Sequence, residues 1–196
     1  LLTRSPRWSA WITARAPDTL QAFGIRTLLQ QAMASVRRHA PCRLAVITAL
    51  FNPRNDARLA ENWRVWRAAL QPHLDRGAIS CAITAEAVWP GQAPTGDGLV
   101  LEASRDQVLW QKERLLNLAL DRLPYEVDAV AWIDADILCD DPAWPQRIRE
   151  ALATADIVQG FEWAAQLGPT GELLARVSSC LRDRGPANWP GYSWAA

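Results

Sequence analysis

The sequence predicts an α/β protein whose mostly parallel sheet is covered by helices on both faces. Apolar runs of strand length alternate along the chain with segments of helical periodicity. The first such run, residues 42–50, lacks the polar alternation of a half-exposed strand, which is typical of a strand buried on both faces. With 196 residues, of which 49% are hydrophobic, the chain suffices for one domain with a sizeable core. We therefore take residues 1–196 as a single domain.

Two helices are predicted around this first strand. Asp18 and Gln21 have the spacing of a capping box, and the apolar stripe behind them predicts a helix over residues 18–38. A second amphipathic helix follows the strand, and we expect Pro72 to stop it, because proline lacks the N–H that continues a helix. Its two tryptophans are expected to pack in the core. The stripes are Leu20, Phe23, Leu28, Ala32 and Val36 in the first helix, and Leu59, Trp63, Trp66 and Leu70 in the second.

The middle of the chain predicts a strand, a loop and a third helix. The strand covers residues 78–84, and Glu86 at its end is a candidate site residue. Residues 90–98 contain two prolines and three glycines, which indicates an exposed and mobile loop. The helix is predicted over residues 108–123, and Pro124 ends it.

The last third predicts a strand over residues 129–133, a helix over residues 142–153 and a short strand over residues 156–161. Asp141 is the expected N-cap of the helix, with Pro142 at its first position. Ligands of such sheets bind beyond the carboxyl ends of the strands. Candidate residues are therefore sought where the strands end.

Composition excludes several classes of function. The 21 basic residues balance 21 acidic ones, which argues against a nucleic-acid partner held by a basic face. The longest apolar run is far shorter than the ~20 residues of a membrane span, so no transmembrane segment is expected. Four cysteines without C-x-x-C spacing favour free thiols in a reducing cytoplasm, and hence a cytoplasmic protein. The absence of an initial Met and the apolar ending at residues 193–196 are consistent with a C-terminally truncated domain.

Two carboxylates mark the strongest candidate site. Asp134 and Asp136 end the strand that begins at residue 129, and alternation along a strand would place both on one side, with Cα atoms about 7 Å apart. Such a pair repels unless a cation lies between its members. Mg²⁺ and Mn²⁺ favour carboxylate and phosphate oxygens, so the pair predicts a metal that bridges the protein to a diphosphate. Capping of the next helix is a weaker explanation, because Asp140 and Asp141 already stand in the right place for it.

These residues give the chain a resemblance to a known family. An apolar strand that ends in Asp-x-Asp, within an α/β chain of this order, resembles the nucleotide-sugar-dependent glycosyltransferases of GT-A fold, in particular family-2-like bacterial and viral members. Asn52-Pro53 after the first strand, residues 109–117 before the acidic strand and residues 191–195 add to the likeness. The resemblance covers roughly residues 42–196. It implies transfer of a sugar, hexosyltransferase-like, from a UDP- or GDP-linked donor to the hydroxyl of a saccharide or other acceptor.

The resemblance also implies roles for individual residues. Asp134 would face the ribose or a metal-bound water, and together with Asp136 it would hold Mn²⁺ or Mg²⁺ against the diphosphate. Residues 110–117 would line the donor pocket, with Lys112 or Arg114 near phosphate. The family's catalytic base and metal-binding His are not assigned here, because both His residues come early and the last acid is Asp183. The remaining donor and acceptor contacts would come from Leu50, Phe51 and Asn52, near the base and ribose, and from Trp194, near the sugar.

Other readings of the carboxylate pair stay open. A metal-dependent nucleotidyltransferase would use the same two residues and release pyrophosphate. A phosphatase resembling the haloacid dehalogenases would use Asp134 as a nucleophile, although its acid and Lys motifs normally lie downstream, and no Lys follows Lys112. A binding domain without turnover would keep the nucleotide-sugar pocket alone.

Overall fold

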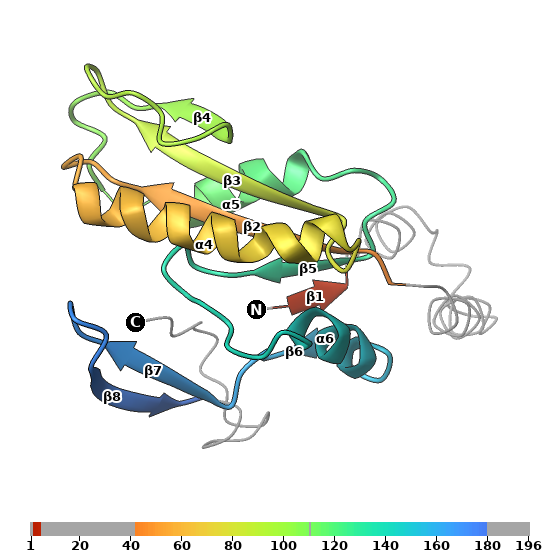
Figure 1. Ribbon diagram of the computed structural model, residues 1–196. Helices are drawn as coiled ribbons and strands as arrows, with labels where there is room; N and C mark the ends of the chain where they lie inside the picture. The colour runs from red at the N-terminus through yellow and green to blue at the C-terminus, as the bar shows by residue number, and fades with distance from the viewer. Residues whose placement is uncertain (1, 5–41, 110, 180–196) are drawn as a thin grey trace, which may run out of the picture.

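The computed structural model describes residues 2–4, 42–109 and 111–179 of the chain. Its main sheet has six strands, and the predicted α/β class is confirmed (Figure 1). The strands are β1 (Leu2–Arg4), β2 (Leu44–Phe51), β3 (Cys81–Val88), β4 (Leu99–Glu102), β5 (Ala129–Trp132) and β6 (Ile157–Val158). Their order is β4-β3-β2-β5-β1-β6. The four strands from β4 to β5 are parallel, whereas β1 pairs antiparallel with both of its neighbours.

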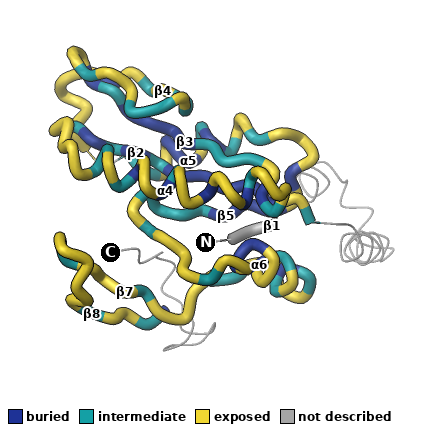
Figure 2. Tube along the Cα trace, viewed as in Figure 1, coloured by how far each residue is buried: buried dark blue, intermediate teal, exposed yellow. Residues whose placement is uncertain are grey.

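Helices cover both faces of the parallel strands, as the sequence predicts. Alternate residues of β2 point to opposite sides, so that Leu44 and Val46 enter one apolar cluster and Ala45 and Ile47 enter another. The first cluster includes side chains of α4 (Ala57–Asp75) and α6 (Trp144–Leu152), and the second includes those of α5 (Lys112–Asp121). The buried residues concentrate in the central strands (Figure 2).

Helix α4 differs from its predicted end. It begins after the N-cap Asp56, whose side chain accepts a hydrogen bond from the N–H of Arg58 (2.8 Å), and it continues through Pro72 to Asp75. Leu70 and His73 are both buried. Burial of these side chains stabilises the last turn by more than proline costs so near a helix end, where one backbone bond is lost. The predicted burial of Trp63 and Trp66 in the core is confirmed.

Helix α6 begins later than predicted. Its first residue is Trp144, and the proline of its first turn is Pro145 rather than Pro142. Asp141 does accept a hydrogen bond from the N–H of Ala143 (2.9 Å), and its other oxygen lies 2.8 Å from Nε of Arg147. Asp141 therefore caps a turn that precedes the helix, in which the N–H of Trp144 also bonds to its carbonyl oxygen (3.1 Å).

Other elements differ in their boundaries or were not predicted. Strand β3 begins and ends later than residues 78–84, α5 is shorter than residues 108–123, and β6 has two residues instead of the predicted 156–161. The edge strand β4 and the antiparallel hairpin of β7 (Trp163–Leu167) and β8 (Leu173–Ser178) were not predicted. The hairpin lies beside the main sheet (Figure 1) and is largely exposed (Figure 2). The predicted helix over residues 18–38 lies outside the described residues.

No helix in the described part of the chain has both the length and the apolar character that crossing a bilayer requires.

Candidate functional site

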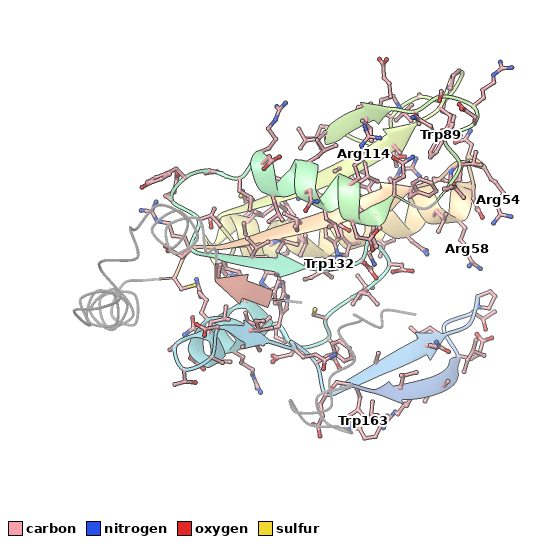
Figure 3. All side chains as sticks on the ribbon, turned by 180° about the vertical axis from the view of Figure 1, so that it is seen from behind. Arg54, Arg58, Trp89, Arg114, Trp132 and Trp163 are labelled. Atoms are coloured by element: carbon pink, nitrogen blue, oxygen red, sulfur yellow. The ribbon has the colours of Figure 1, made fainter. Side chains whose placement is uncertain are left out.

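The carboxyl ends of the parallel strands gather the candidate residues at one edge of the sheet. Strands β2 and β5 are parallel, with Ile47 opposite Trp132. Asn52 follows β2 and Asp136 follows β5, so both residues lie at the same edge of the sheet. Trp132 stands at the end of β5, and Arg54 and Arg58 project at the beginning of α4 (Figure 3).

The two aspartates do not continue the strand as predicted. Strand β5 ends at Trp132, and the following residues form a turn in which the N–H of Ile137 bonds to the carbonyl oxygen of Asp134 (3.1 Å). Because the two residues lie in a turn and not in an extended strand, strand alternation does not place their carboxylates on one side, as the sequence had predicted. Asp136 is exposed, whereas the Asp134 side chain is 19% exposed.

Lys112 pairs with the more buried of these carboxylates. Its Nζ atom lies 2.5 Å from Oδ1 of Asp134, and the side chain of Lys112 is only 14% exposed. The same ammonium lies 4.9 Å from the centroid of the Trp132 ring, within the range of a cation–π contact. The structure thus brings together Lys112, Trp132 and Asp134 from the beginning of α5 and the end of β5.

Trp132 is the member of this group that the sequence did not single out. Its position as the last residue of the strand before the two aspartates was the available signal, because ligands of parallel sheets bind where strands end. The ring also contributes to a hollow of about 270 Å³ between α5 and the sheet, near the lower end of the volumes of ligand pockets. The hollow is lined by Ile47, Glu113, Leu116, Asn117, Leu120, Val130 and Trp132. Within residues 111–117, Glu113, Leu116 and Asn117 line this hollow, whereas Arg114 is exposed and donates to the Oε1 atom of Gln111 (3.0 Å).

The carboxylates of Asp134 and Asp136 suit a divalent cation only if a bound ligand supplies further oxygen atoms. Carboxylate oxygens of Asp134 and Asp136 are of the hard type that Mg²⁺ and Mn²⁺ favour. Among the described residues, no group of three or more His, Cys, Asp or Glu side chains forms a metal site. Mg²⁺ is commonly bound by one or two carboxylates, with phosphate oxygens and water completing its shell. The two carboxylates supply donors of the right chemistry for such a shared site, and in the described part of the chain they do not form a closed protein cage.

Cys139 follows the aspartate turn, but it is a poor nucleophile or metal ligand. Cys139 is an exposed residue, but desolvation of its thiol, assisted by the negative charges of Asp140 and Asp141, raises the pKa of Cys139 to about 11. The thiol is therefore protonated at neutral pH, and the thiolate is the reactive form.

The residues at the end of β2 have structural roles in this conformation. Leu50 is 4% exposed and packs in the cluster beneath α4. Phe51 makes an edge-to-face contact with Trp89, with ring centroids 5.0 Å apart. The Asn52 amide is engaged with Asp56: Nδ2 donates to its carbonyl oxygen (2.9 Å), and Oδ1 accepts from its N–H (2.8 Å). A nucleotide contact from Asn52 would have to replace one of these bonds, whereas Trp194 lies outside the described residues.

Glu86 anchors the loop of residues 90–98 to the same edge. Its carboxylate accepts hydrogen bonds from the N–H of Thr95 (3.0 and 2.9 Å) and from the Thr95 hydroxyl (2.6 Å). Gln92 donates to the carbonyl oxygen of Pro53 (3.2 Å), which joins the loop to the end of β2. Pro94 is exposed, as expected. Glu86 is 5% exposed, and its carboxylate is engaged by hydrogen bonds from the loop. Its role is therefore to position the loop.

Valine has a shape similar to that of threonine but lacks its hydroxyl. Replacing Thr95 by valine is expected to destabilise the protein by about 1–2 kcal/mol, because the buried Glu86 carboxylate loses a hydrogen-bond donor. Thr95→Ser keeps the hydroxyl and is the matched control, so it should recover most of the loss. Urea denaturation followed by circular dichroism measures both free energies of unfolding. Equal stabilities of the valine and serine variants would contradict an anchoring role for the hydroxyl.

Comparison with known proteins gives no relative for this chain: no protein-family model, no curated protein and no solved structure matches it.

Proposed function

We propose that this chain binds a nucleoside diphosphate sugar at the carboxyl edge of its sheet and transfers the sugar to an acceptor hydroxyl, as glycosyltransferases of GT-A fold do. The observation that supports this most is the position of Asp134 and Asp136 in the turn after the central strand β5, with Lys112 paired to Asp134. Both charge types that a metal-assisted diphosphate site uses, carboxylates and a cation, are present at the edge where parallel sheets bind ligands.

The residues have separable tasks in this proposal. Asp134 and Asp136 would hold Mg²⁺ or Mn²⁺, which supplies electrostatic stabilisation of the departing diphosphate when it is bound. Lys112 would supply a second positive charge, in addition to the metal, that neutralises the phosphate groups. Trp132 limits the access of water to the ammonium, which strengthens its interactions. The acceptor hydroxyl must lose a proton, and the described residues do not identify the base.

A phosphatase is the second candidate. An aspartate nucleophile that accepts a phosphoryl group requires a nearby cation to lower the repulsion between its charge and the phosphate. The contact between Lys112 and Asp134 meets that requirement, although Lys112 precedes Asp134 in the chain. In this reading Asp134, and not the acceptor, would attack the substrate.

Product analysis with a panel of UDP- and GDP-sugars in the presence of Mn²⁺ tests the proposal. From these donors a glycosyltransferase releases the free nucleoside diphosphate. A phosphatase releases inorganic phosphate from a phosphate monoester, such as a sugar phosphate supplied in a parallel reaction, because a nucleotide sugar has no terminal phosphate. A nucleotidyltransferase run in reverse requires added pyrophosphate. The Asp136→Asn variant, purified in the same way, controls for contaminating hydrolases. Release of phosphate alone, lost in the variant, would replace the proposed function by the second candidate. Binding of donor without any product would assign a non-catalytic domain.

A further inference from the structure

The Lys112 ammonium occupies the position of a counter-ion on Asp134. It lies 2.5 Å from Oδ1, and both side chains are mostly buried, with 14% and 19% exposed. Lys112 is also the only lysine in the chain, in which all other basic residues of the Lys and Arg types are arginines. The carboxylate that would hold a cation is therefore already neutralised by a protein cation.

A divalent cation and this ammonium compete for the same carboxylate. A divalent cation on Oδ1 of Asp134 would share that oxygen with the Lys112 ammonium, and two positive charges repel strongly in a partly buried site. Lysine can resolve this conflict by moving, because its compact ammonium is carried on a flexible four-carbon stem. It moves at low cost only if another anion receives it.

We propose that Lys112 is an exchangeable counter-ion. Its ammonium moves from Asp134 to the substrate's diphosphate, and this movement makes the metal and the nucleoside diphosphate bind as a unit. This inference rests on the proposed function and specifies the order of binding at that site. Each ligand alone leaves one charge uncompensated. A metal alone repels the Lys112 ammonium, which has no other anion to receive it. A diphosphate alone attracts the ammonium and leaves the Asp134 carboxylate unpaired. Binding free energies are reciprocal, so each ligand tightens the other by the same factor.

Manganese titrations test the coupling, with the electron paramagnetic resonance signal of free Mn²⁺ as the readout. Mn²⁺ is titrated into the wild-type protein, Lys112→Gln and Arg122→Gln, each without nucleotide, with UDP and with GDP, and the same titrations without protein correct for Mn²⁺ bound by free nucleotide. Arg122→Gln is the matched control, because it removes one positive charge from an exposed position directly after the same helix and leaves Asp134 untouched. In the wild type, one of the nucleotides is expected to tighten Mn²⁺ binding at least about tenfold, within the usual range of coupling.

The Lys112→Gln variant separates this inference from the proposed function. It should bind Mn²⁺ alone about tenfold more tightly than the wild type. Nucleotide should tighten Mn²⁺ binding by a smaller factor than in the wild type, because the contact between metal and diphosphate remains but no ammonium has to be displaced. Wild-type coupling that persists unchanged in Lys112→Gln would overturn the inference and leave the metal site standing. Absence of nucleotide-dependent Mn²⁺ binding in all three proteins would overturn both this inference and the metal-assisted function.

A second measurement needs no substitution in the site. Reductive methylation with ¹³C-formaldehyde keeps the positive charge and labels Lys112 as the one side-chain amine, in addition to the chain terminus. Mg²⁺ and UDP together are expected to shift the dimethyl-lysine resonance, whereas Mg²⁺ alone should leave it unchanged. An equal shift with Mg²⁺ alone would show that the metal displaces Lys112 without diphosphate and would contradict coupled binding.

Discussion

Asp136→Asn is expected to weaken nucleoside diphosphate binding about 10- to 100-fold when Mn²⁺ is present and to leave it nearly unchanged when the metal is absent. Asparagine keeps the shape of the side chain but lacks the negative charge that a hard cation requires. Loss of one charge-assisted contact of this kind costs about 1.5–3 kcal/mol. Asp136 is exposed and outside the core, so the folded structure should tolerate the change.

Calorimetric titration with UDP or GDP, with and without Mn²⁺, measures this effect. Asp140→Asn is the matched control, because Asp140 is an exposed aspartate of the same segment, four residues further along. It should behave as the wild type. If the wild type and Asp136→Asn bind equally in the presence of Mn²⁺, Asp136 is no metal ligand.

Trp66→Ala is expected to produce the largest loss of stability, about 3–5 kcal/mol, the range observed for large aromatic side chains in protein cores. Trp66 is 1% exposed and belongs to the apolar cluster that joins α4 and α6 to the sheet. Truncation to alanine removes this burial and leaves a cavity that the helix and strands can fill only partly. The free energy of unfolding from urea denaturation, followed by far-ultraviolet circular dichroism, measures the loss.

Trp66→Phe provides the matched control. Within the described residues, Nε1 of Trp66 is buried and has no hydrogen-bond partner, which is unfavourable by itself. Phenylalanine fills most of the same space and removes this N–H group, so its cost should stay below about 1.5 kcal/mol. A loss from Trp66→Phe as large as that from Trp66→Ala would mean that the indole N–H contributes a favourable interaction.

The core elements of the fold were predictable because their signals are local. The apolar run over residues 42–50 and the stripe from Leu59 to Leu70 correspond to β2 and α4, and the strand over residues 129–133 corresponds to β5. Hydrophobic periodicity reports which face of an element is buried, and it needs no knowledge of the partner. A different rule, that the carboxyl ends of parallel strands lie at one edge of the sheet, accounts for the common position of Asn52 and Asp136.

The missed elements depend on pairing more than on side-chain pattern. Strand β4 has four residues and is held at the edge by its bonds to β3. Gly98 allows this approach, since a Cβ atom there would lie 2.5 Å from the carbonyl oxygen of Thr84. The hairpin of β7 and β8 contains many residues of low strand propensity, and it depends on a turn in which Gly171 has a φ of 83°.

At the candidate site, the sequence alone determined which residue types stand at the strand ends, and the tertiary structure decided what those residues bind. Nothing in the pattern around Lys112 shows that its ammonium lies on Asp134, 22 positions further along the chain, or that Glu86 is occupied by Thr95. Such partners are selected by distances of a few ångströms between side chains from different elements. Periodicity specifies the face on which a residue lies, whereas packing of the completed fold fixes the atom that it contacts.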